Sequence, residues 1–566
     1  MSDSGNAPAT NIIGAGLTGL SAALTLAGQG RKSRLISVQS SERAQSNLAE
    51  GGINAALNVS GEMDSVEEHF ADTMRAGCYL ADPIMVRQLT KAAPQIVQKL
   101  QRLGVPFAKE DGRILQRYFG GQKKKRTAFV KSSTGKALMA AMIDAVRQYE
   151  VAGLVERYSH HCFERLFIHE DRCLGAQCRD AYTEERKAFP GPVIVAAGGM
   201  NGMFFGHTTG TTANTGSVTA NLFEQGVVLS NLEFIQYHPT TVSIPGKRLL
   251  ISEAARGEGG RLMIMRDGRP CYFMEEKYGP DGNRMPRDVI SREMALLSED
   301  VFLDLRGLSQ AIWERRLPDL RDEIQHYLGM DPAKEPVPVA PGIHYCMGGI
   351  RVDEGHRTNR SFLYAAGECA CAYHGANRLG GNSLLGAIFG GRCAAESVMK
   401  DLAGASKGNG NARRIEASNS NENAGKTRFA QASDDENGME FLNGAEEIMS
   451  LQIAAYSSLS CDEQSIEKKM EEALFSGLSI LRNEERLTQA HQTILQLYNR
   501  KETLSDELRA RLHLAEAMLL SALERKESRG AHTRMDYPET KDAFRAQTCA
   551  KWEAGRVGIT FEKRAL

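Results

Sequence analysis

The chain has 566 residues, too many for a single hydrophobic core, so about two to four domains are expected. Its 69 basic and 70 acidic residues nearly cancel, which gives no electrostatic reason to expect nucleic acid or a membrane surface as a partner. The 11 cysteines form no C-x-x-C pair, so the sequence lacks an iron–sulfur or zinc signature and a reduced, cytosolic setting is expected.

The first predicted element is a strand, tight turn and helix. A short apolar run at 11–13 leads into Gly14-x-Gly16-x-x-Gly19, and an alanine- and leucine-rich helix follows at 21–29. Gly14 permits a sharp turn, Gly16 permits close approach of a pyrophosphate, and Gly19 permits packing of the helix on the strand. The N–H groups at the start of that helix can bind phosphate. This context favours a bound dinucleotide over a turn without a ligand.

The second strand, 33–38, is expected to end near an acidic residue that binds a ribose if the dinucleotide is NAD. The position holds Ser37, and the next acid is Glu42. This weakens a general NAD-binding interpretation.

The segment 43–56 resembles a known family. It is similar to the stretch after the second strand in flavoprotein subunits of succinate dehydrogenase and fumarate reductase, and in L-aspartate oxidase. In the first two, a histidine six residues before the Gly-Gly pair usually carries FAD covalently. Counting back from Gly51 gives Gln45, whose amide nitrogen is not nucleophilic. The resemblance therefore implies FAD bound without a covalent link.

Helices are predicted within 62–109 from capping residues and apolar spacing. Asp64, Glu67 and Glu68 are interpreted as a cap and a solvated face, and His69 as a histidine on the helix surface.

The loop 116–127 carries four consecutive cations, of which the three lysines are interpreted as solvated. Arg126 is a candidate for drawing an anionic substrate into a cleft. Phe119 is typical of the succinate and fumarate enzymes, whereas L-aspartate oxidases characteristically carry a glutamate there that can pair with the substrate ammonium.

Another helix is predicted from Thr134 to Tyr149, and a short β-meander from Val151 to Arg186. The buried strand at 193–199 ends in small residues and resembles the second nucleotide contact of the family. In the following Asn-Thr-Gly-Ser, Ser217 replaces the usual aspartate, so a cofactor contact there is in doubt.

Five further segments carry the family's chemistry, at 236–240, 250–260, 286–292, 344–349 and 374–384. Taken singly, their histidines, arginines and acids are typical of structural hydrogen bonds and ion pairs. Glu253 and Arg256, three residues apart, could form a helix-face pair worth only ~0.2–0.5 kcal/mol. Together and in this order the segments favour an active site, because such charge is costly to bury without a ligand. The resemblance covers about 10–400 and returns at 527–532.

The resemblance implies an α/β fold in which a Rossmann-like FAD-binding domain is interrupted by an α+β capping domain and followed by a helical domain. The expected boundaries are 8–236 and 344–403 for the FAD-binding domain, 237–343 for the capping domain, 404–438 for a Gly-, Asn- and Ser-rich linker or disordered insertion, 439–527 for the helical domain and 528–566 for a short C-terminal segment.

The implied activity is interconversion of fumarate and succinate, with hydride exchanged at FAD and a proton exchanged at the other olefinic carbon. Arg287 matches the family's proton donor, which Glu253 and Arg256 would resupply. His238, Ser252, His344, Arg378 and Phe119 are expected to contact the substrate. The expected FAD contacts are Gly14, Ala15, Gly16, Gly19, Ser37, Ser46, Glu50, Gly51, Gly52, Ala197, Gly198, Glu368, Asn382, Ser383 and Leu384.

Without a covalent bond, fumarate reduction is expected to predominate. Because the chain has no cysteine cluster of its own, an iron–sulfur subunit is an expected partner, and any membrane association is expected through an anchor subunit. The alternatives are an L-aspartate oxidase, a reductase of another unsaturated carboxylic acid, and a non-catalytic FAD-binding subunit.

Overall fold

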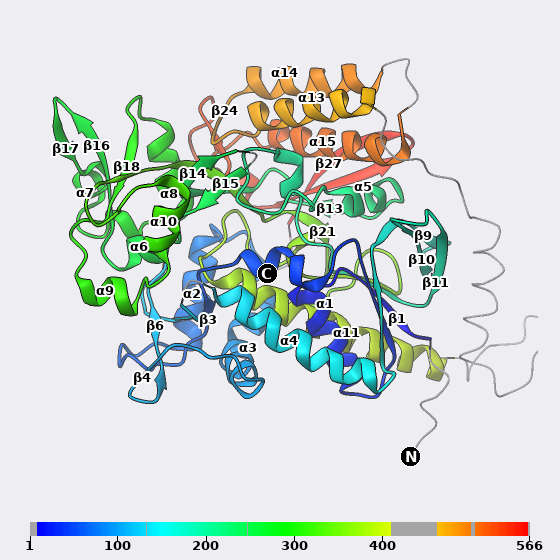
Figure 1. Cartoon of the computed structure of the whole chain (residues 1–566). Coiled ribbons are helices and arrows are strands. Elements are labelled where there is room, and N and C mark those ends of the chain that lie inside the picture. Colours follow the sequence, from blue (N-terminus) through cyan, green and yellow to red (C-terminus); the bar gives the residue numbers. More distant parts are fainter. Residues whose placement is uncertain (1–7, 132, 246, 409–460, 500–503, 564–566) are drawn as a thin grey trace, which may run out of the picture.

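A computed structural model describes residues 8–131, 133–245, 247–408, 461–499 and 504–563 (Figure 1). Its central element is a parallel sheet of five strands in the order β22-β12-β1-β2-β8. The strands are β1 (Thr10–Ile13), β2 (Ser33–Ser37), β8 (Val155–Ser159), β12 (Val193–Val195) and β22 (Leu363–Ala365). β12 has the sequence Val-Ile-Val and is buried throughout, as expected for a central parallel strand.

Helices of the predicted FAD-binding domain lie together beside this sheet in Figure 1. They are α1 (Leu17–Ala27), α2 (Val66–Ala76), α3 (Pro83–Arg102), α4 (Thr134–Val151) and α11 (Asn382–Gly408). α1 packs against both α4 and α11, and α11 also packs against α3. α3 begins where the Asp82 carboxylate accepts hydrogen bonds from the N–H groups of Ile84 and Met85, with Pro83 at the first helical position.

The predicted β-meander is wrong in one respect. β8 is an edge strand of the central sheet, where it pairs with β2 in parallel. Only β9 (His161–His169), β10 (Arg172–Asp180) and β11 (Arg186–Pro190) form the antiparallel sheet. β8 is partly exposed, as an edge strand of either kind of sheet would be. Its sequence of polar and apolar residues is therefore similar to that of a meander strand, and local sequence could not assign β8 to its sheet.

The capping domain has its own hydrophobic core, separate from that of the FAD-binding domain. One sheet contains β14 (Ile235–Ile244), β15 (Lys247–Leu250) and β20 (Ala340–Cys346), and another contains β16 (Arg261–Arg266), β17 (Arg269–Cys271), β18 (Val301–Asp304) and β19 (Val337–Pro338). The helices are α6 (Ala254–Gly257), α7 (Phe273–Tyr278), α8 (Arg287–Ala295), α9 (Gln310–Arg315) and α10 (Leu320–Leu328). β14 and β20 pair where the chain enters and leaves this domain.

The helical domain contains α13 (Cys461–Gly477), α14 (Glu484–Tyr498) and α15 (Asp506–Glu524), which lie together at the top of Figure 1. α15 packs on α5 (Ser217–Glu224) of the FAD-binding domain. α11 continues into the start of the predicted linker, and the rest of that linker, with the start of the predicted helical domain, lies outside the described residues.

The C-terminal segment forms part of a five-stranded sheet with the order β23-β21-β13-β26-β27. Its strands β26 (Gln547–Glu553) and β27 (Arg556–Glu562) extend β13 (Leu229–Ser230), β21 (Gly349–Arg351) and β23 (Ala370–Cys371). The buried Arg525 Nε lies 2.6 Å from Glu233 Oε1, which joins this end of the chain to the FAD-binding domain.

The remaining strands are short. They are β3 (Ile53–Asn54), β4 (Lys109–Glu110), β5 (Arg113–Ile114), β6 (Gln116–Arg117), β7 (Thr127–Ala128), β24 (Leu481–Arg482) and β25 (Thr533–Arg534). Within the described part of the chain, no helix combines the length and apolar character needed to cross a membrane.

Candidate active site

A cavity with a volume of about 480 Å³ extends from the glycine loop to the capping domain. It brings together segments more than 300 positions apart in sequence, such as Gly14 and Arg378. Of the predicted site residues, Gly19, Asn382 and Arg256 do not line this cavity. The others line it: Gly14, Ala15, Gly16, Ser37, Ser46, Glu50, Gly51, Gly52, Phe119, Ala197, Gly198, His238, Ser252, Glu253, Arg287, His344, Glu368, Arg378, Ser383 and Leu384.

Two glycines of the loop make backbone contacts that are too close for a side chain. Gly14 has φ +118°, and a Cβ there would lie 2.1 Å from the carbonyl oxygen of Ala196. A Cβ on Gly19 would lie 1.9 Å from the Gly14 oxygen, so Gly19 serves helix packing. At the start of α1 no side chain caps the helix from the Gly16 position, and the N–H of Leu17 donates to Ser46 Oγ at 3.3 Å. The remaining N–H groups of the first turn are suited to a pyrophosphate.

Two polar atoms in this cavity fit a bound cofactor. Glu50 Oε2 and Asn214 Nδ2 are buried without a hydrogen-bond partner among the described residues, a costly condition unless a ligand pairs with them. Gly198 has φ +79°, and a Cβ there would lie 2.6 Å from Asn214 Nδ2. Burial raises the pKa of Glu368 to about 7, and its Oε1 accepts a hydrogen bond from the N–H of Cys346. These residues fit the polar groups of a dinucleotide.

Ser217, whose cofactor contact was in doubt, lines the same cavity. Its hydroxyl donates to Glu507 Oε1 of α15 at 2.6 Å. The serine therefore joins the cavity wall to the helical domain.

The end of the cavity at the capping domain contains a carboxylate held between two arginines. Arg287 Nη2 lies 2.7 Å from Glu253 Oε2, and Arg256 Nη2 lies 3.1 Å from Glu253 Oε1. Glu253 is only 3% exposed. Burial alone would raise the pKa of Glu253, but the two arginines lower it to about 2, so this carboxylate is ionised at neutral pH.

Two histidines complete this end of the cavity, with ring centroids 5.2 Å apart. Burial and the nearby Arg287 lower the pKa of both His238 and His344 well below the ordinary value, so both imidazoles are neutral hydrogen-bonding groups. Thr209 Oγ1 lies 2.7 Å from His344 Nδ1 and orients that ring.

Arg378 is a cation facing this cavity with unused hydrogen-bonding capacity. Its Nε is buried without a partner in the described part of the chain, and its Cζ lies 4.3 Å from the ring centroid of Tyr345. Burial and the charge of Arg287 lower its pKa to about 9, which still leaves it charged at neutral pH. The site therefore combines neutral donors with excess positive charge, an arrangement suited to a dianion.

Sequence reasoning assigned no role to Gln236, although it stands two residues before His238. Gln236 Oε1 accepts from Arg287 Nη1 at 3.0 Å, and its Nε2 donates to Asn377 Oδ1 at 2.7 Å. Its position in the same short segment as His238 could have identified Gln236 as a site residue. It fixes the guanidinium of Arg287.

Two predictions near α2 are wrong. His69 is fully buried, and its Nε2 lies 3.0 Å from Oδ1 of Asn382, which also accepts from Asn54 Nδ2 at 2.8 Å. Asp64 is buried rather than part of a solvated face, and the α2 cap is Ser65, whose Oγ accepts from the N–H of Glu68.

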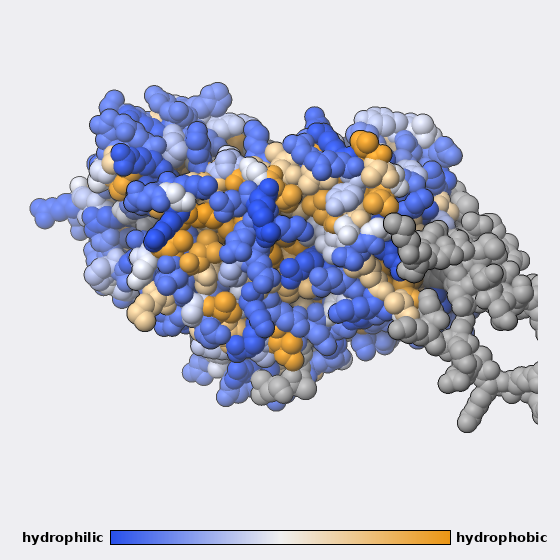
Figure 2. All heavy atoms as spheres, turned by 90° about the horizontal axis from the view of Figure 1, so that it is seen from below, coloured by the Kyte–Doolittle hydropathy of each residue, from blue (hydrophilic) through white to orange (hydrophobic). Residues whose placement is uncertain are grey.

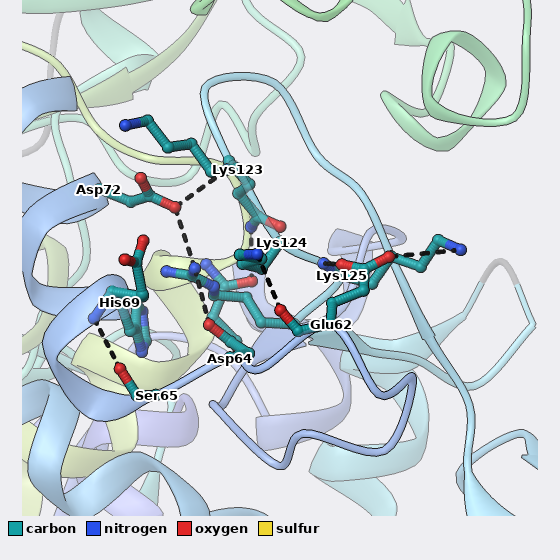
Figure 3. Close-up of polar contacts among 12 residues, drawn as sticks. Glu62, Asp64, Ser65, His69, Asp72, Lys123, Lys124 and Lys125 are labelled. Atoms are coloured by element: carbon teal, nitrogen blue, oxygen red, sulfur yellow. Dashed lines mark hydrogen bonds and ion pairs between the residues drawn. The ribbon is translucent and has the colours of Figure 1, made fainter.

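Arg126 does not face the cavity as an anion attractant. It is fully buried, with Nη2 2.9 Å from Asp64 Oδ1 and 3.0 Å from Asp72 Oδ2. Asp72 also pairs with Arg75, so two guanidiniums and two carboxylates form a structural ion-pair cluster (Figure 3). In the same view Lys124 and Lys125 contact Glu62, so these lysines are only partly solvated.

Comparison with known proteins agrees with this geometry. A family described as "FAD binding domain" matches residues 11–384, and one described as "Fumarate reductase flavoprotein C-term" matches residues 467–566. The succinate dehydrogenase flavoprotein subunit of Bacillus subtilis is 35% identical over 94% of this chain and 91% of its own length. This chain belongs to the succinate dehydrogenase and fumarate reductase flavoprotein family.

Other members of the family show the same extent of similarity. The fumarate reductase flavoprotein subunit of Escherichia coli is 31% identical over 93% of this chain and 88% of its own length. Among solved structures, the FrdA chain of E. coli quinol fumarate reductase aligns with a TM-score of 0.81 and 29% identity, covering 98% of this chain and 96% of that one. As a family member the chain is an FAD-dependent oxidoreductase subunit with the predicted α/β fold.

Proposed function

We propose that this flavoprotein subunit interconverts fumarate and succinate, with fumarate reduction predominating and Arg287 as the proton donor. The observation that supports this most directly is the buried Glu253 carboxylate held between Arg287 and Arg256 at the cavity. When bound, FAD supplies the hydride exchange of the reaction.

Groups at the capping-domain end of the cavity hold the substrate dianion. His238 and His344 donate hydrogen bonds as neutral imidazoles, Ser252 offers a hydroxyl, and Arg378 supplies a positive charge. Stronger binding of one carboxylate as charge develops on it favours the transition state over the ground state.

Arg287 then delivers the proton. A guanidinium is normally a very weak acid, but a carbanion beside a carboxylate is basic enough to take its proton. Gln236 and Glu253 fix three of the guanidinium nitrogens through hydrogen bonds, so one geometry is held for the transfer. Glu253 accepts a hydrogen bond from Arg256 on its other oxygen. This chain of hydrogen bonds provides the route by which Arg287 regains its proton.

L-Aspartate oxidase activity is the second candidate because Gln45 also suits non-covalent FAD. Phe119 argues against L-aspartate oxidase activity. Its ring is 3% exposed and lines the cavity. The ring packs closely on Gly51, where an added Cβ would lie 2.6 Å from Phe119 Cε2. A phenyl ring carries no negative charge and cannot form an ion pair with a substrate ammonium, so ammonia release from aspartate is not expected.

FAD is proposed to bind without a covalent link. Gln45 lines the cavity, and its Oε1 accepts a hydrogen bond from the N–H of Thr211. Acid precipitation of the holoprotein should therefore leave all the yellow colour in the supernatant, measured at 450 nm. Flavin that remains with the washed polypeptide would contradict this.

The direction of the reaction follows from the same substitution. A covalent histidyl bond raises the flavin potential in this family, so without it reduced flavin is expected to be the stronger electron donor. With artificial donors and acceptors, fumarate reduction by the isolated holoprotein should be faster than succinate oxidation. Equal or faster succinate oxidation would contradict the directional proposal.

An iron–sulfur subunit is proposed as the electron-transfer partner, with membrane association through an anchor subunit. The support is the family relationship and the retained segment 528–532, whose Arg529 is buried against Glu527. Purification from native extracts should recover iron with the flavoprotein. A tight, iron-free monomer would contradict the partner proposal.

A further inference from the structure

A second cavity, which we call the rear pocket, lies between α1, α3, α4 and α11. Its volume of about 430 Å³ is within the range of small-molecule sites. No residue lines both this pocket and the cofactor cavity, so its chemistry is independent of the proposed reaction. Figure 2 shows the molecule from the side on which α3 and α4 lie in Figure 1, and hydrophobic patches reach the surface there among hydrophilic side chains.

One wall of the rear pocket is apolar. Leu24 of α1, Ile96 and Leu100 of α3, Met142 of α4 and Ile388 of α11 line it, and each is at most 9% exposed. Because four helices contribute to this wall, it belongs to the packed core of the domain. Such a wall suits an aliphatic chain, since contact with it removes apolar surface from water.

The rim of the rear pocket carries three cations, Lys99, Arg102 and Arg392. Among the described residues, the one carboxylate within ion-pair distance of any of them is Glu396, with Oε1 3.6 Å from Arg392 Nε. Burial and the two neighbouring arginines lower the pKa of Lys99, because the like charges repel one another. An anionic ligand would relieve this repulsion.

We propose that the rear pocket binds an amphipathic anion, with a carboxylate or phosphate head group at the cationic rim and an aliphatic chain along the apolar wall. The charge at the rim selects the head group, and the apolar wall selects the chain. The helices that bind this ligand also reach the cofactor cavity, because Leu17 and Thr18 of α1 and Ser383 of α11 line that cavity. Ser21 Oγ donates to the carbonyl oxygen of Ile388 at 2.7 Å and joins the two helices at the rear pocket.

The test is calorimetric titration of the FAD-loaded protein with hexanoate and octanoate, each below its micellar concentration, and with neutral octanol. Each added methylene that is buried should tighten binding about fourfold, so octanoate should bind about 15-fold tighter than hexanoate. Octanol should bind more weakly than octanoate, and added salt should weaken binding of octanoate.

Two variants locate the site. Lys99→Gln and Arg392→Gln should each weaken octanoate binding about two- to fivefold, as expected for loss of a solvent-accessible charge pair. Lys91→Gln removes a surface lysine of the same helix that does not line the pocket and should leave the affinity unchanged. All three variants should retain wild-type FAD content and fumarate turnover.

Vesicles distinguish a free ligand from a lipid head group. Flotation with vesicles of pure phosphatidylcholine and with vesicles containing phosphatidylglycerol is compared for the wild-type protein and the two pocket variants. Binding of octanoate alone supports a free amphipathic anion, and charge-dependent vesicle binding that both variants lose supports a lipid. Absence of both kinds of binding, or binding that neither variant weakens, would overturn the proposal.

Discussion

Replacing Arg287 by lysine is expected to lower fumarate turnover by about 10²–10⁴-fold while FAD stays bound, the range typical of losing a general acid. Lysine keeps the charge but has one nitrogen, whereas Arg287 uses three to contact Glu253 and Gln236. The measurement is kcat at saturating fumarate, with the flavin absorbance spectrum as the check on cofactor content.

Arg261→Lys is the matched control. Arg261 pairs with Glu275 in the same capping domain, but its side chain is 43% exposed and does not line the cavity. Its substitution should leave turnover within a few-fold of the wild-type value. If Arg287→Lys also remains within a few-fold, Arg287 is not the proton donor.

Replacing Glu253 by glutamine is expected both to destabilise the folded protein and to slow fumarate turnover. Removing one partner of a buried ion pair typically costs about 3–5 kcal/mol, because the remaining charges stay buried and uncompensated. Arg287 and Arg256, at 5% and 2% exposure, are those charges. Denaturant unfolding of the holoprotein at pH 7 measures the loss, and fumarate turnover measures the effect on proton resupply.

The loss of stability caused by Glu253→Gln should become smaller as the pH falls. The pKa of Glu253 falls from 4.5 in the unfolded chain to about 2 in the folded protein. Its stabilising contribution is therefore present above pH 4.5 and is lost as the pH falls towards 2. The difference in unfolding free energy between wild type and Glu253→Gln should be constant from pH 7 to pH 5 and should narrow below that range.

Glu275→Gln is the matched control for this substitution. Glu275 pairs with the partly exposed Arg261, so its loss should cost no more than about 1 kcal/mol. If both glutamine variants lose the same free energy of unfolding, burial of the ion pairs of Glu253 does not add to the stability of the protein.

The elements predicted best from sequence are those with local causes. The turn at Gly14 and the close contact of Gly19 with the Gly14 backbone lie within one short segment, and the structure has both of them. The association of Glu253 with Arg287 could not be predicted from local sequence. Only the resemblance to a family placed these two segments in one site. The spacing of Glu253 and Arg256 alone is also compatible with an ordinary ion pair on a helix face.

The wrong predictions share a physical reason, which is that the deciding partner lies far away in sequence. His69 was placed on a helix surface because nothing nearby contacts it, but its partner Asn382 is 313 residues later. Arg126 stands in a run of cations that is typical of a solvated loop, yet it is neutralised by Asp64, 62 residues earlier. The sheet formed by β13 and β26 likewise depends on tertiary pairing.

The most direct test of the proposed function is a single-turnover experiment with the anaerobically reduced holoprotein. Mixing with fumarate should restore the oxidised flavin spectrum and yield succinate in equal amount to the enzyme-bound FAD. In parallel, mixing the oxidised protein with L-aspartate should neither reduce the flavin nor release ammonia. Reduced flavin that persists in the presence of fumarate, or reduction of the oxidised flavin by aspartate, would contradict the assignment of fumarate and succinate as the substrates.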